Sequence, residues 1–104
     1  MHGNYATSHF VHRAGERLGY TREEAYALAG RLIISIERGL EDHVQFVSRV
    51  DKNGCRLFRF QAVDSRHYYA LVNTDNMRCI TILPAGFEVP RQGNSVLKLK
   101  DVDL

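Results

Sequence analysis

The spacing of apolar residues changes once along the chain, from a helical period to strict alternation. Apolar side chains first recur every three or four positions, at Phe10, Ala14 and Leu18 and then at Ala25, Leu28, Ala29, Leu32, Ile33 and Ile36. Because an α-helix has 3.6 residues per turn, this spacing predicts two amphipathic helices. No internal repeat or low-complexity segment is visible.

Residues with helix-capping chemistry mark both ends of each predicted helix. The first is expected from about residue 8 to Leu18, with Thr7 or Ser8 as its cap and Gly19 as its stop. The second begins after the capping box Thr21-Arg22-Glu23-Glu24 and ends at Gly39. Residues 1–7 are expected to be frayed.

Beyond the second helix, apolar and polar residues alternate in four runs separated by short turns. The runs are His43–Val50, Cys55–Val63, His67–Thr74 and Met77–Leu83. Alternation predicts strands, and short turns make consecutive strands neighbours in a sheet. We therefore expect an α+β fold, with two N-terminal helices packed on a four-stranded antiparallel β-meander. A fifth short strand or an ordered tail is expected near residues 96–100.

The alternation also assigns side chains to two faces of the predicted sheet. The apolar face, which should receive the second helix, holds Val44, Phe46, Phe58, Phe60, Ala70, Val72, Ile80 and Ile82. The opposite face holds Arg49, Arg59, Gln61, Tyr69, Asn73 and Thr81. When one face of a sheet is buried by helices and the other carries Arg, Tyr and Gln side chains, the second face is a candidate binding surface.

Length and composition indicate one globular domain over residues 1–104, with a core of about residues 8–84 and a tail of residues 85–104. Hydrophobic residues make up 44% and charged residues 25%, a balance typical of globular proteins. The chain has no run of 18 apolar residues, and its N-terminus lacks the apolar core of a signal peptide. We therefore expect a cytoplasmic protein that does not engage a membrane.

The charged residues favour an anionic partner. The net charge is only +2, but eleven of the fourteen cationic residues are arginines, which make planar, bidentate contacts with phosphate or carboxylate groups. Cys55 and Cys79 are far apart and form no CxxC motif, so reduced thiols are expected. The five histidines also lack typical metal-site spacing, and we expect neither a metal nor a cofactor.

Three residues of the first predicted helix form a cationic stripe. His9, Arg13 and Arg17 are spaced i, i+4 and i+8, so they share one helix face. Two fixed cations beside a group that titrates near neutral pH suit phosphodiester chemistry, although an ordinary solvated or ion-paired face has the same pattern. His12 is expected to pair with Glu16 on the helix surface.

This arrangement resembles the group of small RelE-like, colicin-D-like and BrnT-like toxins, which share the barnase–colicin–RelE fold. It is most similar to uncharacterised RelE-related domains that open with a His-x3-Arg-x3-Arg helix, matched here by His9, Arg13 and Arg17 and followed by Gly19-Tyr20-Thr21. Tyr69–Asn73 and Ile80–Pro84 look like the last two strands of that group. The resemblance covers roughly residues 8–84, and it implies an RNA-engaging domain, either a metal-independent ribonuclease toxin or a degenerate relative.

Metal-free RNA cleavage needs a base, an acid and cations that stabilise the crowded phosphorane. His9 is the candidate acid or base, and Arg13 and Arg17 are the candidate phosphate ligands. Further substrate contacts are expected from the opposite sheet face, from Arg49, Arg59, Tyr69 and Thr81. Both groups can belong to one site only if the first helix wraps around a sheet edge.

A second hypothesis places the chain in another functional class, that of interaction proteins without enzymatic activity. The modest net charge also suits a non-enzymatic interaction protein, for example a phage or mobile-element inhibitor that grips a host protein through the arginine-rich face or the tail. RNA binding should weaken steeply with salt, whereas a largely apolar protein interface should not. Homodimerisation through an exposed strand is a third possibility, and the oligomeric state stays open.

Overall fold

A computed structural model describes residues 5–50, 53–84, 88–90 and 96–98, the last two ranges by their backbone alone. Two helices precede a four-stranded antiparallel sheet with strand order β1-β2-β3-β4, which confirms the predicted α+β fold. The elements are α1 (Ser8–Leu18), α2 (Arg22–Arg38), β1 (Val44–Arg49), β2 (Cys55–Gln61), β3 (His67–Asn73), β4 (Arg78–Leu83), β5 (Glu88–Pro90) and β6 (Val96–Lys98).

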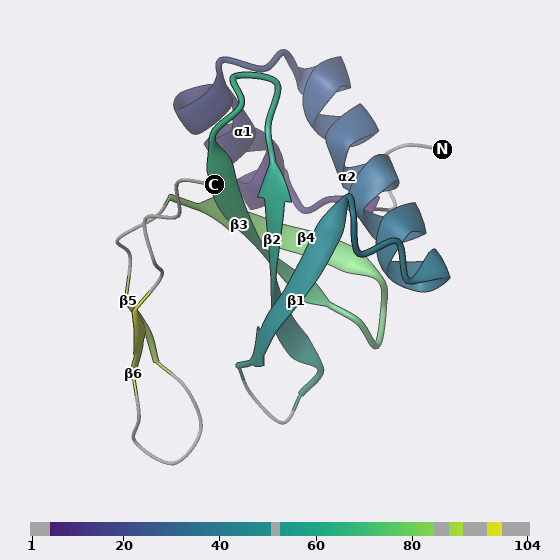
Figure 1. Cartoon of the computed structure of the whole chain (residues 1–104). Coiled ribbons are helices and arrows are strands. Elements are labelled where there is room, and N and C mark those ends of the chain that lie inside the picture. The colour runs from purple at the N-terminus through teal and green to yellow at the C-terminus, as the bar shows by residue number, and fades with distance from the viewer. Residues whose placement is uncertain (1–4, 51–52, 85–87, 91–95, 99–104) are drawn as a thin grey trace.

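Both helices lie on the same side of the four-stranded sheet, and the main core fills the space between them (Figure 1). The core residues of the helices are Phe10, Ala14, Ala25, Leu28, Ala29, Leu32 and Ile33. Those of the strands are Val44, Phe58, Phe60, Tyr68, Ala70, Val72, Cys79 and Ile82. The apolar positions of both helices therefore match the faces that their periodicity predicts.

The predicted helix ends are confirmed. Thr7 caps α1 by accepting a hydrogen bond from the Phe10 amide, and Gly19 ends the helix with φ +68°. Thr21 and Glu24 form the predicted capping box at the start of α2, and Gly39 ends that helix with φ +66°. Glycine adopts this left-handed conformation without the penalty that a Cβ brings.

The prediction that residues 1–7 are frayed is wrong for residues 5–7, which run along the outer edge of β4. Ala6 is buried and bridges Cys79 in parallel, and the Thr7 amide donates to the Cys79 carbonyl at 3.0 Å. The Thr7 hydroxyl donates to the Ile80 carbonyl at 2.9 Å, and Arg78 Nη2 donates to the Ala6 carbonyl at 2.9 Å. These bonds satisfy backbone groups that an edge strand otherwise leaves to solvent.

A bulge in β1 changes the face of one predicted ligand. The register shifts between Phe46 and Ser48, so that Arg49 lies opposite Arg56. Residues directly opposite in a sheet share a face, and Arg56 has the parity of Phe58, which faces the helices. Arg49 therefore does not lie on the same face as Arg59, contrary to the prediction.

A second irregularity changes the core at β4. The register between β3 and β4 shifts between Leu71 and Val72, which places Cys79 opposite Val72. Cys79 is fully buried in the main core, whereas Ile80 is only half-buried. The predicted core position at Ile80 is therefore taken by Cys79, because one extra residue inverts the alternation.

The far side of the sheet, away from the helices, is less polar than predicted. Leu57, Tyr69 and Leu83 form a second buried cluster there, against which Val47, Val50 and Leu71 pack. Tyr69 is 3% and Thr81 8% exposed, so neither side chain is displayed as the sequence suggested. Phe46 differs in the opposite sense: it was expected beneath the second helix but is 60% exposed.

The predicted C-terminal strand is present, although it does not extend the main sheet. β6 pairs antiparallel with β5 in a separate two-stranded sheet. The sequence does not predict the strand β5, because a proline such as Pro90 favours the end of regular structure. Residues 99–100 of the predicted strand lie outside the described part of the chain.

The double role of Thr7 gives a first prediction. We expect Thr7→Val to lower the free energy of unfolding by about 2 kcal/mol, because it removes both a helix cap and the hydrogen bond to Ile80. Thr21→Val is the matched control, since Thr21 caps α2 without contacting the sheet, and it should cost about 1 kcal/mol. Urea unfolding measures both, and equal costs would contradict a role of Thr7 at the sheet edge.

A second prediction concerns the thiols. Burial raises the pKa of the Cys79 thiol to about 12, so it remains protonated and unreactive at pH 8 in the folded protein. With a disulfide reagent at pH 8, one thiol per chain should react quickly and the second only upon unfolding. Cys55→Ser should remove the fast phase alone; a fast phase that survives this substitution would show that Cys79 is accessible.

Candidate functional site

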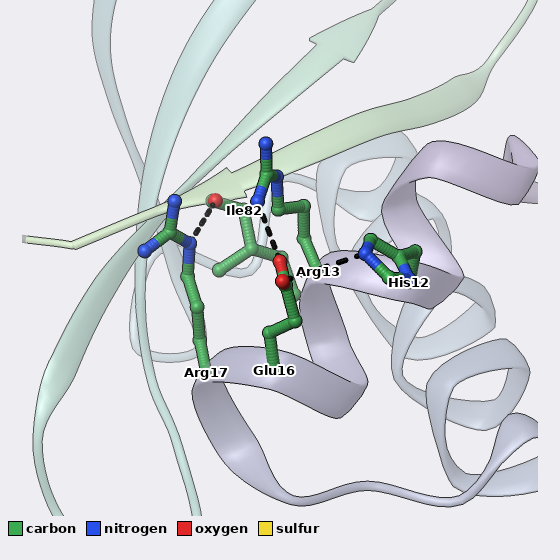
Figure 2. Close-up of polar contacts among 5 residues, drawn as sticks. All are labelled: His12, Arg13, Glu16, Arg17 and Ile82. Atoms are coloured by element: carbon green, nitrogen blue, oxygen red, sulfur yellow. Dashed lines mark hydrogen bonds and ion pairs between the residues drawn. The ribbon is translucent and has the colours of Figure 1, made fainter.

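The α1 stripe, defined as His9, Arg13 and Arg17, lies where the helix meets the outer edge of β4. Side chains of Arg13, Glu16 and Arg17 extend from α1 toward this strand (Figure 2). The helix thus sits at the sheet edge, which is the placement required for the stripe and the far face to meet. The contact is direct, because Arg17 bonds to the backbone of β4.

Arg17 is held by one nitrogen of its guanidinium group. Its Nε donates to the Ile82 carbonyl at 2.9 Å (Figure 2). The two terminal nitrogens have no hydrogen-bond partner among the described residues. Because the guanidinium is planar, fixing Nε also restricts where the other two nitrogens point. Arg17 therefore presents two oriented donors next to the strand that carries Thr81.

Arg13 is paired within the helix. Its Nη1 donates to Glu16 Oε1, and His12 Nε2 lies 3.4 Å from Glu16 Oε2, the contact that the sequence spacing predicts. The hydrogen bond from Arg13 is the main cause that lowers the pKa of Glu16, and the charges of Arg13, His12 and Arg17 act in the same direction. Glu16 is therefore ionised at neutral pH and offsets part of the charge of the stripe.

His9 lies in the first turn of α1 and is exposed. Its imidazole makes no hydrogen bond or ion pair with the described residues. It is thus open to solvent and to a ligand, and its acid–base role stays a prediction.

The structure does not bring the four predicted substrate contacts into one open surface. Arg59 Nη2 donates to Gln45 Oε1 on the far face, whereas Arg49 belongs to the other face. Tyr69 and Thr81 are buried. Of the four, Arg59 alone is a partly exposed cation on the far face, at some remove from the β4 edge because β3 lies between.

Sequence reasoning missed a cluster at one end of strands β1, β2 and β3. His43 and His67 line one hollow of about 80 Å³, together with Asp42, Arg59 and Gln61. A larger hollow of about 320 Å³ shares Asp42, His43 and Gln61 with it and extends toward α2. A signal was present: strands one and three of a meander run parallel, so their first residues lie at the same end of the sheet.

The described residues contain neither a metal-binding group of side chains nor a helix that could span a membrane. No group of three or more His, Cys, Asp or Glu side chains there is arranged to hold a metal ion. No helix in that part of the chain is long and apolar enough to cross a membrane.

No family model, curated protein or solved structure matches this chain. The RelE-like assignment therefore stays an expectation that rests on the motif residues His9, Arg13 and Arg17.

The ion pair at Glu16 gives a third prediction. In carboxyl-detected NMR titration, the pKa of Glu16 should lie below that of an ordinary glutamate and rise toward it in Arg13→Gln, because the main stabilising hydrogen bond is lost. Because the pKa of Glu16 is lowered in the folded protein, the pair stabilises the fold at any pH above the ordinary pKa of a glutamate. This stabilisation is lost as the pH falls through the lowered pKa. Arg22→Gln, on α2, is the control and should leave the pKa unchanged; an equal shift in both variants would contradict the assignment.

Proposed function

We propose that the chain is an RNA-engaging domain that binds the phosphodiester backbone along the α1 stripe and acts as a metal-independent ribonuclease. The observation that carries the proposal is the anchored guanidinium of Arg17. Its Nε is bonded to Ile82, its side chain is half-buried, and its terminal nitrogens have no partner among the described residues. The proposal agrees with the RelE-like motif without depending on a match to any known protein.

Arginine geometry is the reason to expect phosphate there. A guanidinium binds two phosphate oxygens through parallel N–H donors, and a fixed guanidinium loses less side-chain entropy on binding. Arg13 lies one helical turn before Arg17 on the same face, so a second cation is within reach of the same backbone. The exchange of Glu16 for a phosphate as the partner of Arg13 would accompany binding.

The chemistry proposed is attack of a ribose 2′-oxygen on the adjacent phosphorus, with expulsion of the 5′-oxygen and formation of a cyclic phosphate. Glu16, which is ionised at neutral pH, is the proposed acceptor of the 2′ proton. His9, one turn before Arg13, is the proposed donor to the leaving 5′-oxygen. Arg13 and Arg17 would stabilise the additional negative charge of the phosphorane.

The rival proposal, a protein that grips a host protein through an arginine-rich sheet face, has less support. That face retains a partly exposed Arg59, but Tyr69 and Thr81 are buried and Arg49 faces the other way. The rival remains an outcome of the binding experiment below.

The fourth prediction measures binding of a single-stranded RNA oligonucleotide by fluorescence anisotropy in EDTA, at several salt concentrations. Arg17→Ala should weaken binding about tenfold and reduce the salt slope by roughly 0.7, the value for one phosphate contact. Arg17→Lys retains the charge and a donor for Ile82, so it should keep most of the slope. The matched control is Arg38→Ala, which removes an exposed arginine from the last turn of α2 and should leave binding unchanged.

Cleavage is followed in the same buffer with His9→Ala and Glu16→Gln, each expected to reduce the rate on the order of 100-fold. Circular dichroism confirms that each variant is folded. Equal losses in Arg17→Ala and Arg38→Ala would show unspecific attraction and sink the assignment of the stripe. Binding without cleavage would leave an RNA-binding domain, and absence of RNA binding would favour the rival.

A further inference from the structure

Polar side chains from three strands gather at one end of the main sheet. Gln45 lies opposite Arg59 in the β1–β2 register, and Gln61 lies opposite His67 in the β2–β3 register. Arg59 and Gln61 are two positions apart in β2, so these four side chains share the far face. They line the hollow of about 80 Å³ together with His43, which directly precedes β1. One arginine, two histidines and two amides thus meet around one small space.

Several of the donors around this small hollow have no protein partner. Arg59 donates to Gln45 Oε1 through Nη2, whereas its Nε and Nη1 have no partner among the described residues. The imidazoles of His43 and His67 make no hydrogen bond or ion pair with that part of the chain either. An imidazole has at least one N–H donor in either protonation state. Unused donors of this kind, one of them a guanidinium, are the groups that bind an oxyanion.

The small hollow also suits a phosphate group in size. One bound water needs about 10–15 Å³ of such space, so about 80 Å³ holds several waters or one tetrahedral oxyanion. Arg59 supplies a permanent positive charge from β2, the middle of the three strands. The two histidines add donors from the β1 side and from the β3 side. A phosphate in this hollow would therefore meet donors from three strands.

A larger hollow of about 320 Å³ adjoins the small one, between α2 and the end of β2. The two hollows share the residues Asp42, His43, Phe60 and Gln61. The side of the larger hollow toward α2 is formed in part by the apolar side chains of Leu28 and Leu32. Its volume is at the lower end of the range for small-ligand pockets, about 300–1,000 Å³. The pair of hollows therefore suits a ligand with a compact anionic group and a larger, less polar body.

Asp42 lines both hollows and is the one carboxylate among their lining residues. It makes no hydrogen bond or ion pair with the described residues. Its charge opposes a phosphate nearby, and Arg31, which also lines the larger hollow, offsets part of that effect. As an acceptor, a carboxylate binds hydroxyl groups. Cations, a carboxylate and apolar walls thus follow one another in the order of the phosphate, the sugar and the base of a nucleotide.

We propose that the two hollows form a binding site for a nucleoside 5′-monophosphate, either free or at the 5′ end of an RNA strand. The phosphate binds Arg59, His43 and His67 in the small hollow. Asp42 accepts a hydrogen bond from a ribose hydroxyl, and the base lies in the larger hollow against the apolar side chains of α2. No residue of the α1 stripe lines either hollow, so this site does not rest on the proposed ribonuclease function.

The fifth prediction follows a titration of the full chain with adenosine 5′-monophosphate by NMR at pH 7, read at the imidazole signals of His43 and His67. Both should shift, because the phosphate contacts both rings. Adenosine, which lacks the phosphate, should bind at least about tenfold more weakly. An RNA dinucleotide with a 5′-phosphate distinguishes the two sources of the ligand. If it binds as tightly as the nucleotide, the site accepts an RNA end, and if it does not bind, the site takes the free nucleotide.

Three substitutions test the roles of the charged residues. Arg59→Gln should weaken nucleotide binding about tenfold, since it removes the permanent positive charge. Arg66→Gln is the matched control, because Arg66 is exposed directly before His67 but lines neither hollow, and the affinity should stay unchanged. Asp42→Asn should act in the opposite direction and let inorganic phosphate bind several-fold more tightly, because it removes a repulsive charge.

The amide spectrum of each variant shows whether it is folded, and Arg59→Lys, which keeps the charge, should retain most of the affinity. The proposal is overturned if adenosine binds as tightly as its monophosphate or if the imidazole signals do not shift. Equal losses in Arg59→Gln and Arg66→Gln would also overturn it, since they would indicate unspecific attraction. The readout at His43 and His67 separates this site from the α1 stripe, so either can fail without the other.

Discussion

The hydrogen bonds that join the start of α1 to the outer edge of β4 are the contacts on which the rest of the structure depends. Thr7 makes two of them, because its amide donates to the Cys79 carbonyl and its hydroxyl donates to the Ile80 carbonyl; the same hydroxyl oxygen also caps α1. A single residue thereby fixes where the helix begins and where it sits on the sheet. With α1 at the edge, its polar stripe faces the rim of the sheet while Phe10 and Ala14 still reach the core.

The same contacts make the two edges of the sheet unequal. Covering one edge satisfies backbone groups that would otherwise invite pairing with another strand. At the other edge the exposed side chain is Phe46, beside a hollow lined by Val44 and Phe58. The stripe on α1 and the exposed Phe46 on β1 therefore lie at opposite edges of the sheet.

Both helices and strands β1 to β4 could be predicted because their signals are local. Thr21, Glu24 and Gly39 act through bonds within one or two helical turns, and each strand follows from alternation over a few residues. The predictions that were wrong concern residues whose placement depends on other segments of the chain or on irregular strand register. The placement of Ala6 rests on a strand more than seventy positions away, and the faces of Arg49 and Cys79 depend on bulges. Alternation assumes a regular register, so one extra residue reverses every later assignment in that strand.

For the candidate site, the sequence predicted which side chains share a helix face but not what each of them is bonded to. The link between Arg13 and Glu16 follows from spacing, whereas the link between Arg17 and Ile82 requires the tertiary fold. That second bond explains why arginine suits position 17 better than lysine would. A lysine ammonium is one point of charge on a flexible stem, but a guanidinium can bind the sheet through Nε and still offer two oriented donors. Structural anchoring and anion recognition are thus compatible in one side chain, provided that they use different nitrogens.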